Sequence, residues 1–184
     1  MLFVTGTGSS GTTFFIQLLS ELGLTNIDSL FFNKRVKGGY EVRINRNTSY
    51  PIRGKDIVKD PIFFFIDHKA EALDRAEANG SKVTGIWLCM RPFEEAIKSR
   101  SSRGIMIYPD KDISENLSRY KDHLLDFIEV VSSKDIPLVL VDYNLLSDFE
   151  YCYRQIVQFC SVEKSAVELA HKKLYNPSYK NTYK

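Results

Sequence analysis

Apolar runs alternate with amphipathic stretches along the chain, a pattern that predicts strands followed by helices. Residues 1–5 predict a buried strand. Apolar residues at helical spacing then predict a helix that ends at Gly23, a natural C-cap. Asp56–Lys59 predicts a short strand, and residues 83–90 and 137–142 predict two longer buried strands.

Four further helices follow from the same pattern. One should run from residue 62 to the Asn79-Gly80 pair, although Phe63–Ile66 could instead extend as a strand. Residues 113–131 place apolar side chains at steps of four and three, which predicts an amphipathic helix. Ser147–Glu150 predicts a capping box at the start of the next helix, and a last helix is expected over residues 162–174.

Strands that alternate with helices indicate a central, mainly parallel sheet covered on both faces, an α/β fold of three αβα layers. Pro92 suits the first turn of a helix that carries Ser99. Residues 101–111 are expected to form a mobile loop, and the polar tail 176–184 is expected to fray.

Composition indicates one globular domain over residues 1–184. The chain is 43% hydrophobic and 26% charged, and no apolar run approaches the roughly 18 residues of a membrane-spanning helix. A strand that begins next to Met1 leaves no room for a signal peptide, so we expect a cytoplasmic protein. A net charge of +2 does not indicate a nucleic-acid partner. Three cysteines without metal-ligand spacing predict buried, reduced thiols and no metal site.

Basic residues cluster in the irregular segment 24–55, where Gly38-Gly39 could join two strands of a hairpin. The segment is either a solvated flap or a variable insertion whose clustered cations attract an anionic ligand. Residues 34–55 of this segment contain a single acid, Glu41, and the cations Lys34, Arg35, Lys37, Arg43, Arg46, Arg53 and Lys55.

The first strand leads into a glycine-rich segment that matches a phosphate-binding loop. Gly6–Thr13 fits the pattern G-x-x-x-x-G-K-[ST] except that Thr12 stands where ATP- and GTP-using enzymes have a lysine. That lysine reaches the β- and γ-phosphates, whereas the loop N–H groups and the helix N-terminus can hold any tetrahedral oxyanion. The segment therefore favours anion binding without ordinary ATP or GTP chemistry; a plain strand-to-helix turn is the alternative.

Four elements in order resemble the sulfotransferases that use 3'-phosphoadenosine 5'-phosphosulfate (PAPS). The family's first motif ends in Ser-Gly-Thr-Thr, here Ser10–Thr13, and its 3'-phosphate motif is similar to Arg91–Ser99. Val58–Pro61 resembles the Lys-Asp-Pro element of many carbohydrate sulfotransferases, and Leu138–Asp148 is similar to the family's late strand and turn. The resemblance covers roughly residues 1–161 and suggests a small sulfotransferase of bacterial or phage type with a P-loop, nucleotide-kinase-like fold.

The resemblance implies an enzyme that transfers a sulfuryl group from PAPS to a hydroxyl or amine acceptor, without a metal, and releases 3',5'-diphosphoadenosine (PAP). The acceptor would be a small molecule or a glycan, and an anionic acceptor would suit the basic segment. Arg91 and Ser99 would bind the 3'-phosphate; alternatively, Arg91 only ends a strand and pairs with Glu94 or Glu95. The 5'-phosphosulfate would be bound by Gly8, Ser9, Ser10, Gly11, Thr12 and Thr13.

The sequence departs from the family at Ser9, where relatives carry a lysine or arginine that stabilises the leaving phosphate. Lys59 is the best substitute for this missing cation; alternatively, it is an ordinary lysine at the end of a strand. Arg100 and Arg103 are either further phosphate contacts or surface charges. The residue that matches the family's histidine base is Pro61. The candidate bases are therefore Asp60, Asp67 and His68.

Two other functions remain open. A degenerate P-loop kinase or NTPase would use Asp142, at the end of an apolar strand, to hold magnesium. A nucleotide-binding scaffold without catalysis would explain the neutral Ser9.

Overall fold

A parallel sheet of four strands in the order β2-β1-β3-β4 forms the centre of the protein. The structure is a computed structural model that describes residues 1–25, 57–104 and 108–175. Each predicted strand among the described residues forms, within two residues of its expected bounds. The strands are β1 (Leu2–Gly6), β2 (Ile57–Lys59), β3 (Gly85–Met90) and β4 (Leu138–Asp142).

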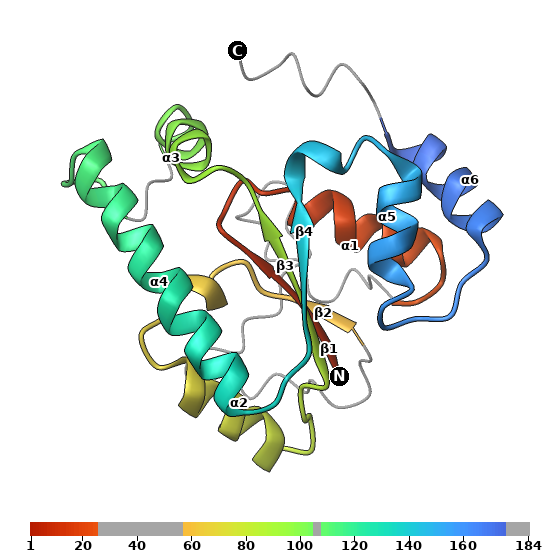
Figure 1. The fold of residues 1–184 in the computed structure, drawn as a ribbon, viewed down its shortest axis with the longest axis horizontal. Helices are drawn as coiled ribbons and strands as arrows, with labels where there is room; N and C mark the ends of the chain where they lie inside the picture. The colour runs from red at the N-terminus through yellow and green to blue at the C-terminus, as the bar shows by residue number, and fades with distance from the viewer. Residues whose placement is uncertain (26–56, 105–107, 176–184) are drawn as a thin grey trace.

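Helices cover both faces of this sheet, which confirms the predicted αβα layering (Figure 1). One face packs against α2 (Lys69–Ala78), α3 (Phe93–Ser101) and α4 (Ile113–Ser133). The other face packs against α1 (Thr12–Glu21), α5 (Phe149–Ile156) and α6 (Lys164–Leu174). Two short 3₁₀ turns, η2 (Phe63–Phe65) and η3 (Tyr143–Leu145), follow the carboxyl ends of β2 and β4.

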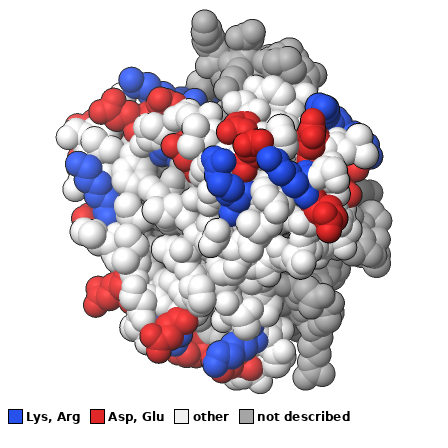
Figure 2. All heavy atoms as spheres, turned by 45° about the vertical axis from the view of Figure 1, so that its right-hand side comes forward, with Lys and Arg blue, Asp and Glu red and all other residues white. Residues whose placement is uncertain are grey.

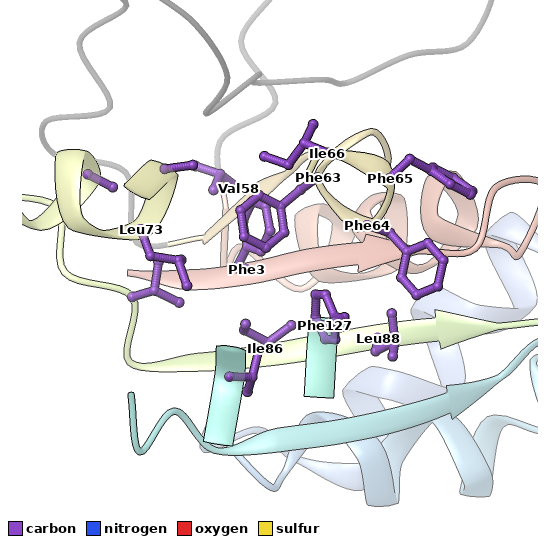
Figure 3. Close-up of a cluster of buried hydrophobic side chains, with 14 of the residues drawn as sticks. Phe3, Val58, Phe63, Phe64, Phe65, Ile66, Leu73, Ile86, Leu88 and Phe127 are labelled. Carbon is purple, nitrogen blue, oxygen red and sulfur yellow. The ribbon is translucent and has the colours of Figure 1, made fainter. Parts of the chain in front are cut away.

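Alternation of side chains along the strands divides the interior into two cores. In β3, Ile86 and Leu88 belong to the core beneath α4, whereas Trp87 belongs to the core beneath α1. Figure 3 shows the first of these cores, in which the rings of Phe3 and Phe63 meet edge to face with centroids 5.0 Å apart.

The connections reverse direction between two neighbouring strands. After β1 the chain continues through α1 on one face, and after β3 it continues through α3 on the opposite face. Ligands of open parallel sheets bind outside the carboxyl ends of the strands at such a switch point. The β1–α1 loop, which contains the predicted phosphate-binding segment, starts at this point.

The prediction of one continuous helix over residues 62–79 is correct for its end at Asn79 but wrong for its first turns. The chain makes the turn η2, extends at Ile66 (φ −80°, ψ 144°) and only then enters α2. The Asp60 carboxylate accepts hydrogen bonds from the N–H groups of Ile62 (2.9 Å) and Phe63 (3.2 Å), which stabilises the tight turn. All three phenylalanines of η2 are buried, and a single helix face could not bury three consecutive side chains.

Two helix caps also differ from the sequence prediction. Asp148, not Ser147, is the N-cap of α5, and its side chain accepts from the N–H of Glu150. A capping box is present instead at α4, between Asp112 and Glu115. Carboxylates and hydroxyls serve equally well at N-caps, so the pattern alone could not select between neighbouring residues.

The predicted flap and hairpin at 24–55 and the polar tail 176–184 lie outside the described residues except for residues 24 and 25, and so does part of the loop 101–111. Cys89 and Cys152 are buried thiols as expected, but Cys160 is only half-buried. Figure 2 shows that charges of both signs are interspersed on the face it displays. No helix of the described parts is both long and apolar enough to cross a bilayer.

Candidate anion-binding site

The loop that joins β1 to α1 has an unusual backbone. Gly8 (φ +73°), Ser9 (φ +52°) and Gly11 (φ +82°) all have positive φ, a region that side chains other than glycine rarely adopt. Added Cβ atoms at Gly8 and Gly11 would overlap Arg100 and Leu146, respectively. Glycine is therefore needed at both positions for conformation and for space.

The loop presents a series of backbone donors at the start of α1. Within the part of the chain that the structure describes, the N–H of Thr7 donates to the carbonyl of Cys89 (3.2 Å), and that of Phe15 donates to the carbonyl of Gly11 (3.0 Å). The N–H groups from Gly8 to Phe14 make no hydrogen bond with any described residue. Successive N–H groups in a turn of this kind, at a helix N-terminus, form a concavity suited to an anion.

Ser10 provides an independent indication of a ligand. Its side chain is fully buried, and its Oγ has no hydrogen-bond partner among the described residues. Buried hydroxyls are normally hydrogen-bonded, so an orphaned one inside a loop of open N–H donors indicates a missing partner.

Lys59 reaches the loop from the neighbouring strand β2. Its side chain is nearly fully buried, and its Nζ donates to the Oγ1 of Thr13 at 3.0 Å. Register places Lys59 beside Val4. Because a buried ammonium is expensive to desolvate, this position is unusual for an ordinary strand-end lysine.

Arg91 follows β3 directly and is held in one orientation by its neighbours. Its backbone N–H donates to the Oγ1 of Thr7 (3.4 Å), and its Nε donates to Glu95 (3.0 Å). The guanidinium lies over the Tyr143 ring, 4.6 Å from its centroid. The ion pair anticipated as an alternative is therefore present with Glu95, but it engages Nε and leaves the two terminal nitrogens for other contacts.

Two further arginines, Arg100 on α3 and Arg103 in the turn after it, adjoin the loop. The guanidinium of Arg100 is almost completely buried against Gly8, and it lies 5.5 Å from the centroid of the Phe65 ring. Arg103 donates from Nε to the carbonyl of Ser99 (2.9 Å) and from Nη2 to the Oγ of Ser9. The sequence did not decide whether these two arginines are phosphate contacts or surface charges. In the structure both lie at the loop.

The three candidate bases occupy different environments. Asp60 is fully buried and stabilises η2 through its carboxylate, while its carbonyl accepts from the hydroxyl of Thr5 at 2.8 Å. Asp67 is exposed, and His68 is the N-cap residue of α2 without a side-chain capping bond. The structure thus gives Asp60 a structural role and does not distinguish a base among the three.

Tyr143 and Thr7 are site residues that the sequence did not single out. The ring of Tyr143 contacts the position of Gly11 and supports Arg91, and buried Thr7 ties the loop to the end of β3. Both follow the carboxyl end of a strand, so the switch-point rule could have indicated them.

Asp142, the magnesium ligand of the kinase alternative, accepts from the N–H of Asn144 (2.8 Å) and so caps η3. Its strand is separated from β1 by β3. Among the described residues there is no cluster of three or more acidic, histidine or cysteine side chains that could hold a metal.

Comparisons with protein-family models, with curated proteins and with solved structures found no match to this chain.

Proposed function

We propose that this protein binds PAPS at the β1–α1 loop and transfers its sulfuryl group to a hydroxyl or amine acceptor. The observation that carries the proposal is the set of N–H groups from Gly8 to Phe14 together with the orphaned hydroxyl of Ser10. They lie at the switch point of the sheet and are bordered by four cations, Lys59, Arg91, Arg100 and Arg103. Such an arrangement suits a ligand with two separated anionic groups.

The loop and α1 would bind the 5'-phosphosulfate. Gly8, Ser9, Ser10, Gly11, Thr12 and Thr13 supply its backbone donors, with hydroxyls from the serines and threonines. Arg91 would bind the 3'-phosphate through its terminal nitrogens, and Ser99 on α3 would add its hydroxyl. The 3'-phosphate distinguishes PAPS from ATP.

In the proposed step the acceptor oxygen or nitrogen forms a bond to sulfur while the bond from sulfur to the bridging oxygen breaks. The bonding electron pair stays on that oxygen, which becomes a terminal oxygen of the 5'-phosphate of PAP. The acceptor loses its proton to a side-chain base or to water. Lys59 would stabilise the developing charge from the α1 side of the loop.

The acceptor and the compartment are also part of the proposal. We propose a small-molecule or glycan acceptor, because the loop begins at the carboxyl end of β1, where ligands of open parallel sheets bind. The three cysteines are free thiols, which is typical of the reducing cytoplasm.

Calorimetric titration of PAP and of ATP, each with and without magnesium, tests the proposal. We expect PAP to bind more tightly than ATP by about tenfold or more, the effect of one additional charge-assisted contact, and we expect magnesium to make no difference. Equal affinities, or a magnesium-dependent preference for ATP, would support the kinase alternative and refute the sulfotransferase proposal.

A further inference from the structure

Ser9, in the middle of the β1–α1 loop, is a neutral residue with an unusual backbone conformation. Ser9 is one of only two non-glycine residues with positive φ in the described chain. Strained residues of this kind persist where the surrounding structure holds them, and they concentrate at functional sites. Ser9 is followed by the orphaned hydroxyl of Ser10 and by the glycine that begins α1.

Arg103 supplies a positive charge at this position from another element. Its Nη2 donates to the Oγ of Ser9, and its Nε is fixed on the carbonyl of Ser99 at 2.9 Å. The hydrogen bond from Nε to Ser99 spans four residues and orients the planar guanidinium. Arg103 therefore loses less side-chain freedom when it binds an anion. The cation is thus prepositioned beside residue 9 although residue 9 is a serine.

Lys59 does not occupy the same place. Its Nζ is bound to Thr13, in the first turn of α1, whereas Arg103 is bound to Ser9 before that helix begins. The two cations therefore border opposite ends of the segment that carries the open N–H donors. Arg100, on α3 and three residues before Arg103, lies against Gly8.

We propose that Arg103 is the cation of the phosphate-binding loop, supplied from the turn after α3 to a loop whose own residue 9 is a serine. This inference rests on the proposed function, because it assigns Arg103 to the 5'-phosphate end of the nucleotide. Arg103 contacts the phosphate whose bridging oxygen gains charge as the sulfuryl group leaves, and Arg91 contacts the 3'-phosphate at the other end. The loop is therefore equipped for catalysis despite the neutral Ser9.

Three adenine nucleotides allow the two ends of the proposed site to be tested independently. Adenosine 5'-monophosphate carries only the group assigned to Arg103, adenosine 3'-monophosphate carries only the group assigned to Arg91, and PAP carries both. We expect Arg103→Ala to weaken binding of PAP and of adenosine 5'-monophosphate by about tenfold or more, the effect of one charge-assisted contact. Binding of adenosine 3'-monophosphate should remain unchanged.

Arg75→Ala is the matched control, because Arg75 is an exposed arginine in the last turn of α2, which leads to the amino end of β3. It should bind all three nucleotides as wild type does. Arg103→Gln keeps most of the side chain without its charge and should reproduce the loss, while Arg103→Lys should restore only part of the affinity, because lysine has the charge but not the Nε that is fixed on Ser99. Thermal unfolding followed by circular dichroism verifies that each variant is folded.

A compensating substitution tests the position of the charge. Ser9→Lys in the Arg103→Ala background should regain affinity for adenosine 5'-monophosphate, because it returns a cation to residue 9. Failure of this rescue would overturn the assignment. So would an Arg103→Ala variant that binds PAP as wild type does, or one that loses affinity for the two monophosphates equally. If wild type binds no PAP at all, the proposed function itself fails.

Discussion

Arg91 forms an ion pair with Glu95 and is also the residue proposed to bind the 3'-phosphate. The pair joins Nε to a carboxylate that is about half exposed, at 3.0 Å, and it is an i,i+4 contact at the start of α3. Exposed pairs of this type contribute little to stability. Their larger effect here is to orient the guanidinium on the Tyr143 ring.

If Arg91 binds the 3'-phosphate as proposed, substitutions at these two residues should affect PAP binding differently. Arg91→Ala removes a charge-assisted contact and should weaken PAP binding by about 1.5–3 kcal/mol. Glu95→Gln keeps the side-chain size but removes a negative charge near the ligand, so PAP affinity should be unchanged or slightly higher. Calorimetric titration of PAP measures both variants. If Arg91→Ala binds PAP as wild type does, Arg91 is only a structural residue at the end of β3.

Sequence patterns predicted the identity of the loop residues better than their partners. Glycine spacing placed Gly8 and Gly11 in the loop, and the structure gives a reason for each, since Arg100 and Leu146 fill the space that a side chain would need. The contact of Arg103 with Ser9 joins residues 94 positions apart, and no local pattern contains such information. Long-range contacts of this kind depend on how α3 packs against the loop.

At the scale of elements, the β1–α1 loop combines two costs that glycine avoids. Gly11 has φ +82°, and a Cβ there would overlap Leu146 and lie 3.2 Å from Tyr143. Gly23 has a similar φ of +70° after the same helix, but a Cβ there would meet nothing within 4 Å. A side chain at Gly23 would therefore meet only conformational strain, whereas one at Gly11 would meet both strain and steric overlap.

Alanine at these two glycines should destabilise the protein to different extents. Gly23→Ala should lower the free energy of unfolding by about 1–2 kcal/mol, the cost of the left-handed conformation. Gly11→Ala should lower it by a further ~1–3 kcal/mol, because the η3 turn must move away from α1. Urea denaturation measures both values. Equal losses would show that η3 accommodates the extra methyl group without strain.

The turn η2 is the element that the sequence predicted wrongly, and the reason is tertiary. Phe63–Phe65 satisfies helical and extended patterns equally, because every position in it is apolar. What decides the conformation is the buried Asp60 carboxylate at the end of β2, together with a core that receives all three rings. Neither feature is visible in the local run of residues.

At the scale of the whole molecule, the alternation of apolar strands and amphipathic helices was sufficient to predict a parallel sheet with helices on both faces. It did not give the strand order, which places β1 between β2 and β3 and so creates the switch point at the loop. That order depends on which strands pair in space, not on the pattern within any one of them.

A buried histidine couples the core beneath α4 to pH. His123 is 8% exposed, and its ring stacks on that of Tyr108 with the ring centroids 6.1 Å apart. Its Nε2 is hydrogen-bonded to the Tyr108 hydroxyl. Burial lowers the pKa of His123 below its ordinary value of 6.5, and the nearby ammonium of Lys69 lowers it further. The carboxylates that oppose this effect on the pKa are those of Asp67, Asp122 and Asp126.

Because the folded protein keeps His123 neutral, the unfolded chain binds an additional proton once the pH falls below about 6.5. The free energy of unfolding should therefore decrease as the pH falls from 6.5 toward the lower pKa of the folded state, by at most about 1.4 kcal/mol per pH unit from this group. Above that window the contribution is constant. Urea denaturation at a series of pH values measures the slope, and His123→Gln, which cannot take up the proton, should remove this part of it. An identical pH dependence in wild type and His123→Gln would mean that His123 can be protonated within the folded core, and that other groups set the acid sensitivity of the protein.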